Sequence, residues 1–177
     1  MAYQSVFKRY ELKYLLTRKQ KKAVLQAMAP YMELDEYGRK TIRNIYFDTE
    51  NYRLIRKSLE KPAYKEKLRI RSYSKVSSED MVFVELKKKY DSVVYKRRMA
   101  LEENQAMDWV LGKKPCVKQS QISNEIDYVL QYYRTLAPAV FLTYEREAFF
   151  EPDGGDFRVT FDENILCRQE AISLKAD

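Results

Sequence analysis

The stretch KLRIRSY at residues 67–73 alternates basic and apolar side chains. In an extended strand, side chains two positions apart point to the same face of the sheet. Leu68 and Ile70 therefore share one face. The opposite face carries Lys67, Arg69, Arg71 and Tyr73. The stretch predicts a β-strand with one apolar face to bury and one strongly basic face.

Five further segments gather basic side chains on one face in the same way. VFVELKKK at 82–89 sets Phe83, Glu85, Lys87 and Lys89 opposite Val82, Val84 and Leu86. VVYKRRMAL at 93–101 groups Lys96 and Arg98 with Val94, and YEREAF at 144–149 groups Arg146 with Tyr144. RYELKYLL at 9–16 groups Arg9, Glu11 and Lys13, and FRVTFD at 157–162 groups Arg158, Thr160 and Asp162. Six strands are therefore expected to present a basic face.

The order of the predicted elements indicates an α+β fold. Strands are expected near 5–16, 42–48, 65–74, 81–89, 93–101, 139–149 and 156–162,. Helices are expected at 18–29, 50–60, 103–111 and 121–136, with Thr17 and Gln20 forming a capping box before the first,. So many short strands favour an antiparallel β-barrel or strongly curled sheet with flanking helices, built as one domain over residues 1–177,.

Composition restricts the chemistry without choosing a ligand. Lysine and arginine number 33 against 26 acidic residues, and the net charge of +7 favours an anionic partner such as nucleic acid, a phosphate compound or a lipid surface,. The chain has no histidine, and Cys116 and Cys167 are far apart, so neither a zinc site nor a disulfide framework is indicated,. The charged start and the lack of a long apolar run predict a cytoplasmic protein without membrane insertion,.

Two interpretations of the basic faces compete. In an ordinary antiparallel sheet the charged face meets water. Repeated cations on neighbouring strands repel one another, however, unless a polyanion compensates them. If the faces line the inside of a barrel, arginine forks and lysine point charges suit a chain of phosphates. Glu11, Glu85 and Asp162 then become candidate ligands for Mg²⁺ or Mn²⁺, which prefer oxygen,.

The ordered set of segments resembles a known family. RYELKYLL, IYFDT, KLRIRSY, VFVELKKK, YKRRMAL, YEREAF and FRVTFD together cover about residues 6–166. They are similar to the vacuolar transporter chaperone (VTC) domain of the triphosphate tunnel metalloenzyme, or CYTH-like, superfamily. The resemblance implies an antiparallel tunnel and the synthesis of inorganic polyphosphate from ATP with Mn²⁺ or Mg²⁺.

The resemblance also implies roles for individual residues. Lys13, Arg69, Arg71, Lys87, Lys96, Arg146 and Arg158 match basic tunnel positions of the family. We expect the phosphoryl transfer itself to depend on Arg69, Arg71, Lys87 and Lys96. Substrate binding is assigned to Lys13, Arg146, Arg158, Lys89, Arg98 and Tyr73, and metal binding to Glu11 and Glu85. The expected ligands are ATP and inorganic polyphosphate or triphosphate.

The sequence departs from the family pattern at both ends. The superfamily's ExExK signature reads Arg9, Glu11 and Lys13 here, with arginine in place of the first carboxylate. The strand with a Glu-x-Lys motif that ends a VTC domain has no counterpart in RQEAISLKAD at 168–177. We therefore expect an incompletely closed barrel.

Several alternatives stay open at this stage. A metal-dependent triphosphatase would use the same basic wall, and a non-catalytic polyphosphate- or nucleotide-binding module would need no metal carboxylate. Nucleic acid is not expected, because Tyr10, Tyr14 and Tyr95 fall on the apolar faces, where core packing explains them,. Glu85 can equally well neutralise Lys87 and Lys89. Neither an oligomer nor a partner in a membrane complex can be identified.

Overall fold

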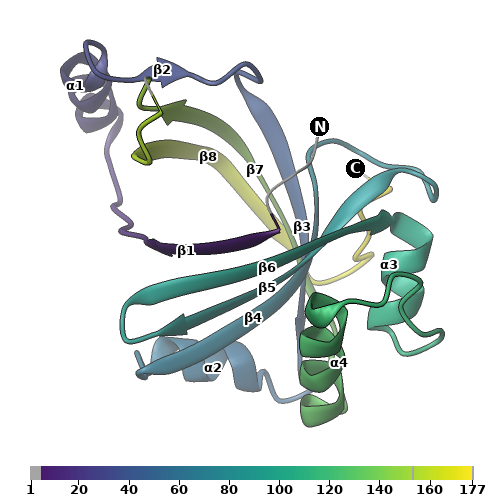
Figure 1. Cartoon of the computed structure of the whole chain (residues 1–177). Helices are drawn as coiled ribbons and strands as arrows, with labels where there is room; N and C mark the ends of the chain where they lie inside the picture. Colours follow the sequence, from purple (N-terminus) through teal and green to yellow (C-terminus); the bar gives the residue numbers. More distant parts are fainter. Residues whose placement is uncertain (1–4, 153, 177) are drawn as a thin grey trace.

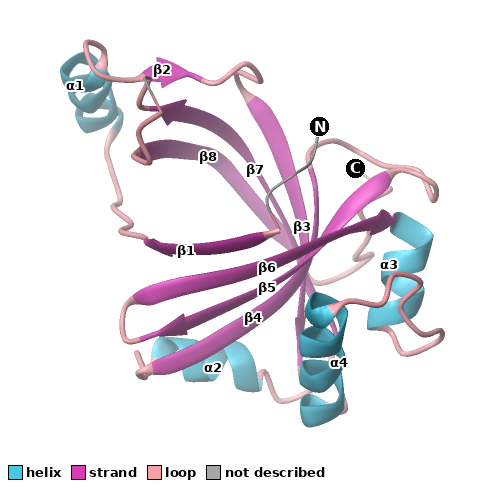
Figure 2. Ribbon diagram, viewed as in Figure 1, coloured by secondary structure: helices cyan, strands magenta, loops and turns pink. Residues whose placement is uncertain are grey.

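The computed structural model describes residues 5–152 and 154–176. In this part of the chain, eight strands form one antiparallel sheet, and four helices flank it (Figures 1 and 2). The strands are β1 (Val6–Tyr10), β2 (Glu33–Leu34), β3 (Lys40–Asp48), β4 (Tyr64–Ser72), β5 (Met81–Tyr90), β6 (Val93–Glu102), β7 (Ala137–Phe150) and β8 (Arg158–Arg168). The helices are α1 (Arg18–Met28), α2 (Arg53–Leu59), α3 (Glu103–Val110) and α4 (Gln121–Tyr133).

The sheet is an open half-barrel. Its strands follow the order β1-β6-β5-β4-β3-β7, β8 pairs with β7, and the short β2 pairs with the end of β7. Figure 1 shows the sheet curling so that β1 and β8 lie at its two edges. Within the described residues these two edge strands do not pair with each other. The expectation of an incompletely closed antiparallel barrel is confirmed.

The main core lies on the outer face of the sheet. Leu68, Ile70 and Leu86 are completely buried there, beside Val82 and Val84. Helices α3 and α4 cover this face with, among others, Trp109, Ile126 and Val129. Removing this apolar surface from water is the main stabilising contribution. The apolar faces predicted for 67–73 and 82–89 are thus confirmed, and their basic faces are left on the inner side.

A second apolar cluster packs α1 against β7 and β8. Met28, Met32 and Phe161 are buried together, with Phe149 and Val159 packed against them. The capping box forms as predicted: the Thr17 hydroxyl accepts the backbone N–H of Gln20 at 3.2 Å. The chain therefore crosses from β1, at one edge of the sheet, to the outer face of β7 and β8 before α1 begins (Figure 1).

Two expectations near the start of the chain are wrong. The first strand ends at Tyr10 instead of residue 16. Tyr10 and Tyr14 are 79% and 75% exposed, so they do not pack into the core. These tyrosines stay exposed because β1 is an edge strand that is hydrogen-bonded to β6 on one side. In the described part of the chain, no helix packs against β1. Tyr95, in contrast, is partly buried.

Helix α2 begins later than predicted, at Arg53. The Asp48 carboxylate accepts the backbone N–H groups of Leu54 and Ile55 at 2.8 and 2.9 Å, and the Thr49 hydroxyl accepts that of Arg53. Asp48 therefore accepts free N–H groups of the first helical turn, although Tyr52 is the residue at the N-cap position,. None of the helices in the described residues has the length and apolar character needed to cross a membrane.

Candidate functional site

The basic residues of β4, β5 and β6 lie in cross-strand rows on the inner face. The strand register places Arg71 beside Phe83, Arg69 beside Glu85, and Lys67 beside Lys87. On β6, Ala100, Arg98 and Lys96 continue these rows in the same order. We call them the Phe83 row, the Glu85 row and the Lys87 row, and together the basic wall. Successive rows lie two residues apart along each strand, or about 7 Å.

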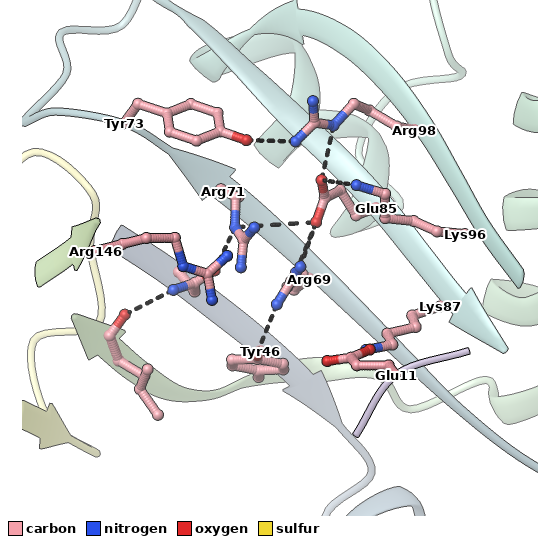
Figure 3. A network of polar contacts seen from close by, with 12 residues as sticks. Glu11, Tyr46, Arg69, Arg71, Tyr73, Glu85, Lys87, Lys96, Arg98 and Arg146 are labelled. Atoms are coloured by element: carbon pink, nitrogen blue, oxygen red, sulfur yellow. Dashed lines mark hydrogen bonds and ion pairs between the residues drawn. The ribbon is translucent and has the colours of Figure 1, made fainter. Parts of the chain in front are cut away.

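Glu85 is the centre of the basic wall (Figure 3). Its side chain is completely buried, yet four cations surround it. Arg69 and Arg98 donate to it at 2.6 to 2.8 Å, and Lys96 and Arg71 lie 3.6 and 3.9 Å away. Burial raises the pKa of Glu85, but these positive charges outweigh burial and hold the pKa well below its ordinary range,. Glu85 is therefore ionised, and the cations outnumber it.

The two central arginines are also held by uncharged groups from β3 and β7. Arg69 Nη1 donates to the Tyr46 hydroxyl at 2.8 Å. Arg71 donates from Nε to Asn44 Oδ1 and from Nη2 to the Tyr144 hydroxyl, at 2.9 and 2.8 Å. Burial raises the pKa of Tyr46, but the charge and hydrogen bond of Arg69, together with the charges of Arg71 and Lys67, outweigh burial and lower the pKa. Both guanidinium groups are thus fixed in orientation before any ligand arrives.

A second ion pair lies beside the Lys87 row. Glu11 contacts Lys87 directly, and Lys13 lies 3.6 Å from Glu11 with its own side chain 81% exposed. Burial raises the pKa of Glu11, but Lys87 and Lys13 outweigh it and lower the pKa to about 2. Lys96 lies 3.8 Å from the centre of the Phe7 ring. Burial lowers its pKa to about 7, although Glu85 acts in the opposite direction.

The remaining predicted site residues lie farther from Glu85. Arg146, on β7, binds both carboxylate oxygens of Asp162 at 2.6 and 2.7 Å and stacks over the Tyr144 ring. Because Arg71 also contacts Tyr144, this ring links Arg146 to the basic wall. Arg158 is exposed at the start of β8. Lys89 is partly buried one row beyond Lys87, and Tyr73 follows β4 beside Phe83.

Sequence reasoning did not assign roles to Asn44, Tyr46 and Tyr144. All three are polar side chains that contact the central arginines. Asn44 and Tyr46 are two residues apart in the segment before Asp48, so alternation alone would have placed them on one face,. The pairing of β3 with β4, which turns that face toward the arginines, could not be read from the alternation.

A divalent metal, which the fold family implies, has few oxygen ligands here. Glu85 does not fit, because four cations enclose its buried carboxylate. Asp162 is occupied by Arg146. Glu11 is paired with Lys87 and Lys13, but its side chain is 33% exposed, and it would fit as one ligand once phosphates engage these lysines, with phosphate oxygens and water supplying the others,. No cluster of three or more metal-binding side chains occurs among the described residues.

Comparisons with known proteins identify one family. The family model of the VTC domain matches residues 8–177. No curated protein matches the chain. Among solved structures, a candidate adenylate cyclase from Bacillus halodurans is similar over 90% of this chain and 79% of its own, at 15% identity and a TM-score of 0.48. A candidate adenylyl cyclase from Hippeastrum with a dominant triphosphatase activity is similar over 88% and 75%, at 12% identity and a TM-score of 0.42.

Proposed function

The chain belongs to the VTC domain family, and on this premise we propose that it is a polyphosphate polymerase-type domain. It would bind ATP and polyphosphate on the basic wall and transfer the γ-phosphoryl group of ATP to the growing polyphosphate chain. The observation that carries the proposal is the surplus of cations around Glu85: Arg69, Arg71, Lys96 and Arg98 converge on one carboxylate. A triphosphate is the type of ligand that compensates such a cluster.

Phosphoryl transfer depends mainly on positioning and on the stabilisation of charge. Arg69 holds Glu85 through Nε and Nη2 and Tyr46 through Nη1, so one N–H group remains on each terminal nitrogen,. These two remaining donors suit the oxygens of a phosphate group. The rigid guanidinium therefore needs little reorganisation when charge develops on the transferred phosphate.

The acceptor would be the terminal phosphate of the polymer. One of its oxygens attacks the γ-phosphorus, the bond from that phosphorus to the bridging oxygen breaks, and ADP leaves with the electron pair. We assign Lys87 and Lys96 to the acceptor side, because both belong to the Lys87 row. A metal bound with the phosphates would neutralise further charge, and Glu11 would be its ligand from the protein.

The main rival is a non-catalytic module that binds polyphosphate or nucleotide. The enclosed position of Glu85 favours it, because the three rows of the basic wall hold no other carboxylate. A triphosphatase needs in addition a carboxylate that positions water. The two rivals differ in their products: a binding module releases nothing, and a triphosphatase releases orthophosphate without polymer.

The test is incubation of the purified chain with ATP and Mn²⁺, with polymer measured on gels and orthophosphate by colour. The critical variant is Arg69→Ala/Arg71→Ala. Its matched control is Lys88→Ala/Arg97→Ala, which removes two cations on the outer face that pair with Glu125. Polymer from the parent and the control, but not from the critical variant, is the expected result. Bound polyphosphate without polymer would establish the binding module, and no binding at all would refute the proposal.

A further inference from the structure

The basic wall changes in character along its strands. The Glu85 row is built from arginines around a carboxylate, and the Lys87 row carries lysines. At the other end, the Phe83 row brings an aromatic ring next to Arg71. A ligand with a charged and an aromatic part could therefore contact lysines at one end of the wall and an aromatic ring at the other.

An aromatic pair occupies the Phe83 end. The rings of Tyr73 and Phe83 meet edge to face, with centroids 5.7 Å apart. The Arg98 guanidinium lies over both rings, 4.2 Å from the centre of Phe83 and 5.8 Å from that of Tyr73. It also donates from Nη2 to the Tyr73 hydroxyl (Figure 3). Arg98 thus joins the aromatic pair to Glu85.

These contacts fix Tyr73 in place without covering it. Its hydroxyl is held by Arg98 and its ring by Phe83, yet 38% of the residue remains exposed. A fixed, partly exposed aromatic ring next to a phosphate-binding arginine is a suitable platform for a nucleobase, because bases stack on aromatic side chains through their π-faces. Inorganic triphosphate has no group that could use this ring.

We propose that Tyr73, Phe83 and Arg98 form a subsite for the nucleobase of a nucleoside triphosphate. The base stacks on Tyr73, and the triphosphate runs along the strands past the Glu85 row toward the Lys87 row. This orientation leaves the γ-phosphate facing the lysines, where the acceptor polymer would enter. The inference rests on the proposed function, because it concerns the same wall, but it adds the direction in which the nucleotide lies.

The subsite predicts a difference between two ligands. Replacing Tyr73 should weaken the binding of ATP by roughly five- to 100-fold, which corresponds to the loss of one base-stacking contact. Inorganic triphosphate should bind within about twofold of the parent, because Arg69, Arg71 and Lys96 keep their contacts with Glu85,. If Tyr73 acted only by orienting Arg98, both ligands would weaken together.

Calorimetric titration of ATP and of inorganic triphosphate into the parent, Tyr73→Ala and Tyr73→Phe would test this. Tyr73→Phe keeps the ring and loses the hydroxyl, so its ratio of ATP to triphosphate affinity should match the parent's. Tyr73→Leu repeats the test with greater bulk if the alanine variant is unstable. An equal loss for both ligands in Tyr73→Ala, or no loss for either, overturns the subsite while leaving the wall intact. A parent that binds neither ligand overturns the proposed function itself.

Discussion

Arg69 and Glu85 face each other across β4 and β5, and the guanidinium donates to one carboxylate oxygen from both Nε and Nη2, at 2.8 and 2.6 Å. The carboxylate is completely buried. Buried ion pairs of this kind are costly to form and more costly to break, because an unpaired charge remains without water. Glu85 therefore stabilises the fold, because its negative charge offsets the repulsion among the three arginines and the lysine around it. The same arrangement holds these cations in position to bind an anion.

The first prediction concerns removal of that carboxylate. Glu85→Gln keeps the size of the side chain but leaves Arg69, Arg98 and Lys96 without their counter-charge. We expect the free energy of unfolding to fall by about 3–5 kcal/mol, measured by urea denaturation. Added inorganic triphosphate should restore part of the loss, because it binds the folded state.

Glu125→Gln is the matched control. Glu125 is likewise paired with cations, Arg97 and Lys88, but on the outer face, where its side chain is 23% exposed. Its replacement should cost less than about 1 kcal/mol. Equal stability of the parent and Glu85→Gln would contradict the central role given to Glu85.

The second prediction is a pH dependence of stability due to Lys96. Burial lowers the pKa of Lys96 to about 7 in the folded protein, below its ordinary value of 10.5. Between these pH values the unfolded chain holds a proton that the folded chain releases, so stability contributed by this group rises with pH. Relative to Lys96→Met, the parent should gain stability from pH 7 to pH 10 in urea denaturation. A constant difference between the two proteins across this range would show that Lys96 titrates normally.

The third prediction concerns the order in which metal and phosphate bind. Since Glu11, the carboxylate assigned to the metal, is paired with Lys87 and Lys13 in the absence of a ligand, Mn²⁺ should bind tightly after inorganic triphosphate and weakly before it,. Electron paramagnetic resonance of free Mn²⁺ measures this directly. Glu11→Gln should reduce the uptake of Mn²⁺ in the presence of triphosphate, whereas Glu125→Gln should not. Stoichiometric Mn²⁺ binding without phosphate would contradict the assignment.

The fourth prediction concerns the attachment of α1. Lys21 donates to Glu147 at 2.9 Å and to Glu163 at 2.8 Å, one on β7 and one on β8. Lys21→Met removes both bonds and leaves two carboxylates near each other, so we expect a loss of about 1–2 kcal/mol in the free energy of unfolding. Lys22→Met, at an exposed position of the same helix, should change stability by less than about 0.5 kcal/mol,. Equal effects of the two substitutions would show that the packing of Met28 and Phe161 alone holds the helix.

The faces of the central strands could be predicted from the sequence. Alternation places Arg69 and Arg71 opposite Leu68 and Ile70 whatever the neighbouring strands are, because the period of two is a property of the extended backbone,. The capping of α1 by Thr17 could also be predicted, because it involves residues three positions apart,.

The partners of each charged residue could not be predicted in this way. The strand face of Glu85 leaves two interpretations open: a metal ligand, or a counter-charge for Lys87 and Lys89, its neighbours on the same face. Glu85 pairs instead with Arg69 and Arg98 from the strands on either side. These partners depend on register, which packing and turns fix together. Between β5 and β6, the two-residue turn at Asp91 and Ser92, with φ of 41° and 68°, fixes the register of the two strands,.

The sequence by itself therefore determined the composition of the inner wall: a set of cations on one face of each strand, fixed by local backbone geometry. Only the tertiary structure decided that Lys87 meets Glu11, that Tyr46 and Asn44 hold the arginines, and that the chain leaves the sheet after Tyr10. Each of these depends on contacts between residues distant in sequence. Such contacts form only when the sheet curls around a common interior, and no periodicity within one strand contains that information.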